Sequence, residues 1–126
     1  MPRQAVFSEH APRPGGAYSQ AIHAHGWVFL SGQLPIDPAT GALVTSSAAE
    51  MYRQCLRNLG AVCDAAGGSI AKLVKLNVYF VDPNLSAALD EVMPEFFEQP
   101  YPARTRLTVC QLSRGAAIEL DAIMML

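Results

Sequence analysis

The chain has 126 residues, with nine Lys or Arg, eleven Asp or Glu and a formal net charge of −2. Nucleic-acid binders usually carry a clear positive excess, because neutralising phosphates supplies most of their affinity, so this charge disfavours RNA or DNA as the main partner. Apolar residues make up 51% of the chain and charged residues only 16%. We expect a single domain over residues 1–126 whose remaining apolar surface is buried between subunits of an oligomer.

The cysteines and the apolar runs indicate in which cellular compartment the protein is expected. Cys55, Cys63 and Cys110 are too widely spaced for a disulfide framework or a structural zinc site, which predicts buried thiols in a reducing compartment. The longest apolar run, Ala122–Leu126, is far shorter than the roughly 18 residues that span a membrane, and no signal-like segment follows Met1. We therefore expect a cytoplasmic protein with no membrane partner.

The N-terminal third predicts a hairpin of two strands. Residues 18–24 and 27–31 flank Gly26, and a short extra strand is expected near Val6. Every residue from Trp27 to Leu30 is apolar, so both faces of that strand should be covered. Helices can cover one face, and a partner subunit is expected on the other.

A helix is predicted next, beginning near Ser47. Ser47 and Glu50 have the spacing of a capping box, and Gly67-Gly68 supplies the stop. The apolar positions between them repeat at steps of three and four, as on one helix face: Tyr52, Cys55, Leu59, Val62 and Ala66.

The C-terminal half predicts a strand, a helix and two strands. Residues 72–81 alternate, with Val74, Leu76, Val78 and Phe80 on one face and Lys75, Asn77 and Tyr79 on the other. A helix follows residues 82–84, and Pro94 should bend it or end it early. It carries an apolar stripe of Leu85, Leu89, Val92 and Phe96. Strands at about 104–110 and 117–125 complete an α+β fold, with two helices packed on one face of a mixed β-sheet.

Arginine and carboxylate side chains are the candidates for chemistry. Arg104 begins a strand, and its guanidinium can hold a carboxylate through two parallel hydrogen bonds. Glu119 and Asp121 share a face of an otherwise apolar strand, where acidic groups are costly unless they are paired or functional. The alternatives are that Arg104 is a solvated surface residue, and that the carboxylates pair structurally with Arg104 or Arg106.

Two histidines have weak metal-site spacing. His23 and His25 would share one strand face, but no third ligand lies nearby. Solvent-facing histidines are the simpler interpretation, and no metal or cofactor is expected. The motifs of P-loop, dinucleotide-binding and nucleophile-elbow proteins are absent, so any reaction must need few groups.

Six stretches together resemble the RidA/YjgF family of reactive-intermediate deaminases. They occur in family order and spacing over nearly the whole chain, and the ordered set is much more specific than any one fragment. The stretches are residues 16–21, 30–35, 65–68, 74–79, 101–104 and 118–122.

The resemblance implies a chorismate-mutase-like fold assembled as a homotrimer, with a ligand cleft at each subunit interface. It implies hydrolysis of 2-aminoacrylate-type enamines and imines, such as 2-iminopropionate or 2-iminobutyrate, to 2-keto acids and ammonia. Arg104 matches the residue that grips the substrate carboxylate, and Glu119 the one that positions or activates water. Tyr18, Ser31 and Gly32 match positions that line the pocket.

Two positions depart from the family pattern. Arg106 stands where many of these deaminases have a cysteine, and it should face the same way as Arg104. It suggests a dicarboxylate or bulkier anionic substrate, unless Arg106 simply pairs with Asp121. Ala17 replaces a common proline and is expected to loosen the loop before Tyr18.

Three other functions remain open at this stage. One is an RNA-cleaving translation inhibitor, an activity ascribed to some relatives. Another is a non-catalytic trimeric module that binds metabolites or protects other proteins. The third is a chorismate mutase, which would need several cationic groups around a dicarboxylate.

Overall fold

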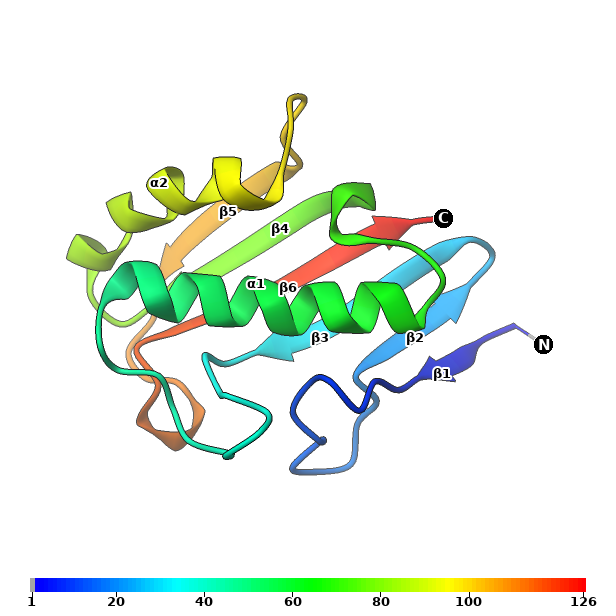
Figure 1. Ribbon diagram of the computed structural model, residues 1–126, viewed down its shortest axis with the longest axis horizontal. Helices are drawn as coiled ribbons and strands as arrows, with labels where there is room; N and C mark the ends of the chain where they lie inside the picture. Colours follow the sequence, from blue (N-terminus) through cyan, green and yellow to red (C-terminus); the bar gives the residue numbers. More distant parts are fainter. Residues whose placement is uncertain (1) are drawn as a thin grey trace.

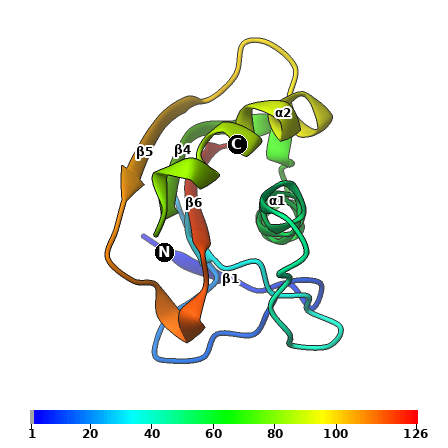
Figure 2. The same cartoon turned by 90° about the vertical axis from the view of Figure 1, so that its left-hand side faces the viewer.

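The computed structural model describes residues 2–126, in which six strands form one sheet in the order β1-β2-β3-β6-β4-β5 (Figure 1). Only β4 and β5 are parallel; the other neighbours are antiparallel. Both α-helices lie on the same side of the sheet (Figure 2), which confirms the predicted mixed sheet with two helices on one face. The elements are β1 (Gln4–Val6), β2 (Ala21–Ala24), β3 (Trp27–Gln33), α1 (Ala48–Ala65), β4 (Leu73–Phe80), α2 (Ala87–Phe96), β5 (Ala103–Thr108) and β6 (Ile118–Met125).

Helix α1 begins and ends where its capping residues predict. The Ser47 hydroxyl accepts a hydrogen bond from the Glu50 backbone N–H at 3.1 Å. The Glu50 carboxylate does not turn back to Ser47 but pairs with Arg53, so only half of the capping box forms. Gly67 has a φ of +89°, the left-handed conformation that ends a helix at little cost when the residue is glycine.

The core lies between the helices and the sheet. The buried face of α1 consists of Tyr52, Cys55, Leu56, Asn58, Leu59, Val62 and Cys63. The Tyr52 hydroxyl donates to the Leu85 carbonyl at 3.0 Å, which ties α1 to the segment that leads into α2. Helix α2 buries Leu89, Val92 and Met93 and ends at Phe96, two residues after Pro94, as expected for an early end.

Strand β4 alternates as predicted except at one position. Leu76, Val78 and Phe80 are buried against the helices, but Val74 is 41% exposed. The pairing of β4 with β6 shifts register between Leu73 and Lys75, and Leu73 takes the buried position instead. The prediction for Val74 was therefore wrong, because an irregular residue in a strand reverses the alternation on one side of it.

The turn between β2 and β3 separates the two histidines. Strand β2 ends at Ala24, and His25 lies in the turn with a φ of +52°. His23 and His25 therefore do not share a strand face, and that prediction was wrong. Within residues 2–126, no group of three His, Cys, Asp or Glu side chains is placed to hold a metal ion.

The sheet face away from the helices, here called the outer face, is partly apolar and uncovered in one chain. Val28 and Leu30 of β3 are buried, whereas Trp27 is 39% and Phe29 49% exposed. Leu107 and Met125 are also exposed, and their pairing partners Tyr79 and Trp27 place them on this face. The expected partner on the outer face thus remains a prediction, now with defined residues.

The predictions for cysteines and membrane segments have different outcomes. Cys55 and Cys63 are buried as expected, but Cys110 is exposed, so the prediction of buried thiols was wrong for it. Over residues 2–126, no helix has the length and apolar character needed to cross a bilayer.

Candidate active site

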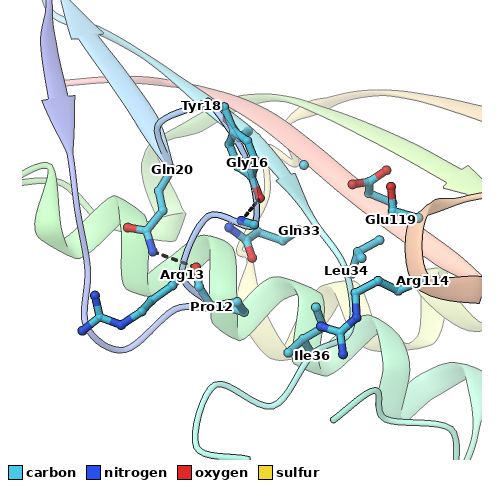
Figure 3. A pocket seen from close by; sticks show the side chains of 14 residues that line it. Pro12, Arg13, Gly16, Tyr18, Gln20, Gln33, Leu34, Ile36, Arg114 and Glu119 are labelled. Carbon is cyan, nitrogen blue, oxygen red and sulfur yellow. Dashed lines mark hydrogen bonds between the residues drawn. The ribbon is translucent and has the colours of Figure 1, made fainter. Parts of the chain in front are cut away.

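A pocket of about 570 Å³ opens where the loop before β2, the end of β3 and the start of β6 meet (Figure 3). The Glu119 carboxylate lies in it, together with Tyr18, Ser31 and Gly32. Four of the six residues singled out from the sequence therefore meet in one place. Arg104 and Arg106 do not line this pocket.

A one-residue bulge in β3 makes room for the Glu119 carboxylate. Leu30 pairs with Ala122 and Gln33 with Leu120, so β3 has one more residue than β6 between these pairs. A bulge of this kind re-aims nearby groups and is common beside functional sites. A Cβ added to Gly32, within the bulge, would lie 2.5 Å from Oε2 of Glu119. Glycine leaves the carboxylate its present position, whereas any side chain at residue 32 would have to push the Glu119 carboxylate aside.

Glu119 is a half-buried carboxylate with no internal partner. Burial raises its pKa above the ordinary value, and the neighbouring negative charge of Asp121 raises the pKa further. Among residues 2–126, no side chain or backbone group donates a hydrogen bond or ion pair to it. Its oxygens are therefore free to bind water or ligand, and a raised pKa suits a group that accepts and returns a proton.

The other pocket residues are held by backbone contacts. The Ser31 hydroxyl donates to the Ser19 carbonyl at 2.6 Å. The Tyr18 backbone N–H donates to the Gly16 carbonyl at 3.0 Å, and its hydroxyl accepts from Gly15 at 3.3 Å. These bonds fold the loop over the pocket even though Ala17 replaces the expected proline.

Asp121 is paired, but not with an arginine. The Asn77 amide donates to its Oδ1 at 2.7 Å and the Tyr79 hydroxyl donates to its Oδ2 at 2.8 Å. These two donors hold the Asp121 carboxylate in place on the strand that also carries Glu119. The alternative in which Arg106 pairs with Asp121 is wrong, as is pairing of either carboxylate with Arg104.

Arg104 and Arg106 lie together on β5 and share one carboxylate. Nη1 of Arg104 is 2.7 Å from Oδ1 of Asp90, and Nη1 of Arg106 is 3.2 Å from Oδ2. The prediction that both arginines face the same way is confirmed. The two guanidinium groups hold the pKa of Asp90 below its ordinary value.

This arginine pair lies on the opposite sheet face from Glu119. Arg104 pairs in register with buried Leu76 and contacts Asp90 of α2, on the helix side. Glu119 is in register with Tyr79, on the outer face. One chain alone therefore does not bring Arg104 and Glu119 together.

The pocket lining also contains five polar residues that were not predicted as site residues: Arg13, Gln20, Gln33, Ser113 and Arg114. Gln20 is buried and bonds to Ser8 and to the Pro12 carbonyl, which shapes the loop. Arg13 and Arg114 bring two positive charges to the pocket lining. The sequence signal for Arg114 is its place in Ser113-Arg114-Gly115, a turn directly before the strand that carries Glu119.

The model of the family described as Endoribonuclease L-PSP, the YjgF/RidA family, matches residues 8–126. The chain belongs to this family. A RutC family protein of Pyrococcus horikoshii is 41% identical, with 96% of each chain covered. A protein of Rattus norvegicus named 2-iminobutanoate/2-iminopropanoate deaminase is 36% identical and covers 96% of this chain and 88% of its own.

Solved structures agree in fold. RidA from a Psychrobacter species superposes with a TM-score of 0.93 at 36% identity, covering 98% of this chain and 99% of its own. A Thermotoga maritima protein described as a putative endoribonuclease gives 0.93 at 36% identity, covering 98% and 97%. The family thus includes members named for imine hydrolysis and members named for RNA cleavage.

Proposed function

We propose that the protein is a cytoplasmic enamine/imine deaminase. It hydrolyses 2-aminoacrylate-type intermediates, such as 2-iminopropionate or 2-iminobutyrate, to 2-keto acids and ammonia. The observation that carries the proposal is the Glu119 carboxylate, which is half-buried, unpaired and raised in pKa within a pocket. Five relatives between 34% and 36% identical bear the name of this activity, which supports it further.

The reaction needs little more than one side chain positioned to accept and return a proton. Water adds to the C2 carbon of the N-protonated imine while Glu119 accepts one proton of the water, which gives a neutral carbinolamine. Glu119 then returns that proton to the nitrogen. As the C–N bond breaks, the carbinolamine hydroxyl gives its proton to the departing ammonia, and the keto acid and ammonium leave. Such proton transfer typically contributes about 10²–10⁴-fold to the rate.

Arg104 is the proposed anchor of the substrate carboxylate, and it must come from a second chain. Arg104 and Glu119 of one chain lie on opposite faces of the sheet. The exposed apolar groups on the outer face supply a surface for the neighbouring copy. A chorismate-mutase-like homotrimer, with sheets inside and helices outside, would place Arg104 of one subunit at the Glu119 pocket of the next. Tyr18, Ser31, Gly32 and Arg106 are proposed to contact the bound substrate.

The first experiment measures keto-acid release from freshly generated 2-iminobutyrate. The wild type should accelerate it, and Arg104→Ala and Glu119→Gln should each lose about a hundredfold or more in kcat/KM. Arg57→Ala and Glu91→Gln are matched controls, because both residues are exposed on helices away from the pocket. No acceleration by folded wild-type protein would contradict the proposal.

Mixing the two inactive variants tests the shared site. If each pocket takes Glu119 from one subunit and Arg104 from another, a randomly assembled equal mixture should regain about a quarter of wild-type activity. Absence of any recovery, with mixed assembly shown by mass spectrometry, would place both residues in one subunit's site.

RNA cleavage is the second candidate, favoured by the description of the family model. The same preparations should be incubated with labelled single-stranded RNA. Cleavage that Glu119→Gln abolishes, without imine turnover, would replace the deaminase proposal. Ligand binding without turnover of either substrate would favour a binding module instead.

A further inference from the structure

The Glu119 pocket contains more positive than negative charge. Its charged lining residues are Arg13, Arg114 and Glu119. Within the part of the chain that the structure describes, neither arginine takes part in an ion pair. Because the pKa of Glu119 is raised, the pocket becomes more cationic still whenever that carboxyl takes up a proton. One chain thus forms an anion-attracting pocket without any contribution from Arg104.

Arg114 is held in place at the edge of this pocket. Its Nη2 donates to the Gly41 carbonyl at 3.0 Å, which joins the turn before β6 to the loop after β3. This contact uses one of the five N–H donors of a guanidinium and leaves the others for a ligand. Figure 3 shows the Arg114 side chain next to Ile36, with Leu34 between it and Glu119 in this view.

The backbone of Arg114 is strained. Its φ of +59° lies in the left-handed region, which non-glycine residues other than Asn and Asp rarely adopt. Glycine would fit this turn without strain, and such strain tends to persist where it serves a function. Arg13 differs, because its guanidinium lies 5.3 Å from the Phe7 ring centre and is already engaged there. In Figure 3 the Arg13 guanidinium also points away from Glu119, so Arg114 is the better-placed arginine of the pocket lining for a ligand held at Glu119.

We propose that Arg114 binds a second anionic group of the substrate, so that the preferred substrates are dicarboxylic imino acids. The proposal rests on the deaminase function and specifies its substrate class. Arg104 already accounts for the carboxylate next to the imine, so a monocarboxylate gives Arg114 nothing to bind. A second carboxylate, on the side chain of the substrate, matches a guanidinium in the same pocket as Glu119.

The same class of substrate was suggested from the sequence through Arg106. In the structure, Arg106 shares Asp90 with Arg104, so part of its charge is already neutralised. Among the residues that the structure describes, no carboxylate pairs with Arg114. Arg106 and Arg114 are thus competing candidates for binding the second carboxylate, and substituting each one separately distinguishes them.

The test compares 2-iminoglutarate with 2-iminobutyrate as substrates. Arg114→Asn removes the charge, and asparagine tolerates a positive φ, so the turn should still form. We expect the ratio of kcat/KM for the dicarboxylate over the monocarboxylate to fall about ten- to a hundredfold, because the loss falls mainly on the substrate with the second carboxylate. Arg114→Lys should lie between, because lysine keeps the charge without the fork. Arg57→Ala is the control.

Three results would overturn the proposal. The ratio could stay constant in Arg114→Asn, both rates could fall equally, or the ratio could fall in Arg106→Ala instead. Calorimetric binding of 2-oxoglutarate and 2-oxobutyrate measures the same preference without turnover. If no imine is hydrolysed but 2-oxoglutarate binds more tightly and depends on Arg114, the deaminase function fails and the anion subsite stands. If imines are hydrolysed and the substrate preference does not depend on Arg114, the deaminase function stands and the anion subsite fails.

Discussion

The Glu119 pocket and the arginine pair on β5 differ in whether their charged side chains have partners within the chain. At β5, two guanidinium groups share the Asp90 carboxylate, and the pKa of that carboxyl is lowered. In the pocket, Glu119 has no hydrogen-bond or ion-pair partner among residues 2–126, and burial beside Asp121 raises its pKa. The first arrangement is internally satisfied and the second is not, so the pocket is the region whose charged group can still accept a hydrogen bond or an ion pair from a ligand.

The difference also shows what one chain lacks. A carboxylate without a donor and arginines near a sheet edge are complementary, yet they lie on opposite faces of the same sheet. In the proposed oligomer, a second copy would bring them together. Experiments that alter one of these regions can use the other region as an internal reference.

The largest expected effect comes from filling the space beside Glu119. Gly32→Ala puts a methyl group 2.5 Å from the present position of Oε2 and must displace the carboxylate. A displacement of about 1 Å can lower the rate of an oriented reaction on the order of a hundredfold, so we expect that loss in kcat/KM for 2-iminobutyrate. Gly60→Ala in α1 is the control, because its Cβ meets only ordinary contacts at 3.8 Å. Equal activity of both variants would show that the Glu119 position is not critical.

The next effect is on the pH profile. If Glu119 accepts a proton from water, kcat/KM should fall at acidic pH as its raised pKa is crossed from above. Asp121→Asn removes the negative charge that adds to this raised pKa. The acidic limb should move to lower pH while the rate at neutral pH changes little. A limb at the same pH in both proteins would show that another group controls it.

A smaller effect is expected on the stability of the β5 region. The pKa of Asp90 is lowered in the folded chain, so its contribution to stability is present above its unfolded pKa and is lost as pH falls. Because Asp90 is 55% exposed, Asp90→Asn should cost at most about 1 kcal/mol at neutral pH, measured by urea unfolding. The cost should vanish in acid. A loss of stability that persists at low pH would show that Asp90 contributes through packing rather than through its charge.

Removing the Glu119 charge should have a small effect on stability, opposite in sign to that of Asp90→Asn. Glu119 has a raised pKa in the folded chain, so stability falls as pH rises from its ordinary value through the folded value. Glu119→Gln removes that loss and should raise the melting temperature at neutral pH while activity disappears, a common exchange at functional sites. The gain should be absent in acid, where Glu119 is uncharged. Destabilisation at neutral pH would instead assign Glu119 a structural role.

Much of the fold could be predicted because local patterns determine it. The Ser47 cap, the spacing along α1 and the alternation in β4 each depend on near neighbours in sequence. The error at Val74 comes from a register shift against β6, a strand distant in sequence. The error at His25 is local, because His25 and Gly26 form the tight turn between Ala24 and Trp27. Alternation predicts which face a residue occupies but not where a bulge interrupts it.

The site could be predicted only in part for the same reason. The match to family motifs brought Tyr18, Ser31, Gly32 and Glu119 into one group, and the structure places all four in one pocket. Strand faces could not reveal which groups bond across the sheet, so the true partners of Asp121 were missed. Arg114 was missed because a turn residue carries no periodic signal, and its role depends on contact with a loop 73 residues away.

The exposed outer face has a practical consequence for anyone handling the protein. Trp27 is the only tryptophan in the chain and is 39% exposed on that face when the chain is alone. Indole emission moves to longer wavelength in water and to shorter wavelength in an apolar contact. The fluorescence spectrum of a diluted sample therefore reports directly on whether that face is wet or covered, without any label.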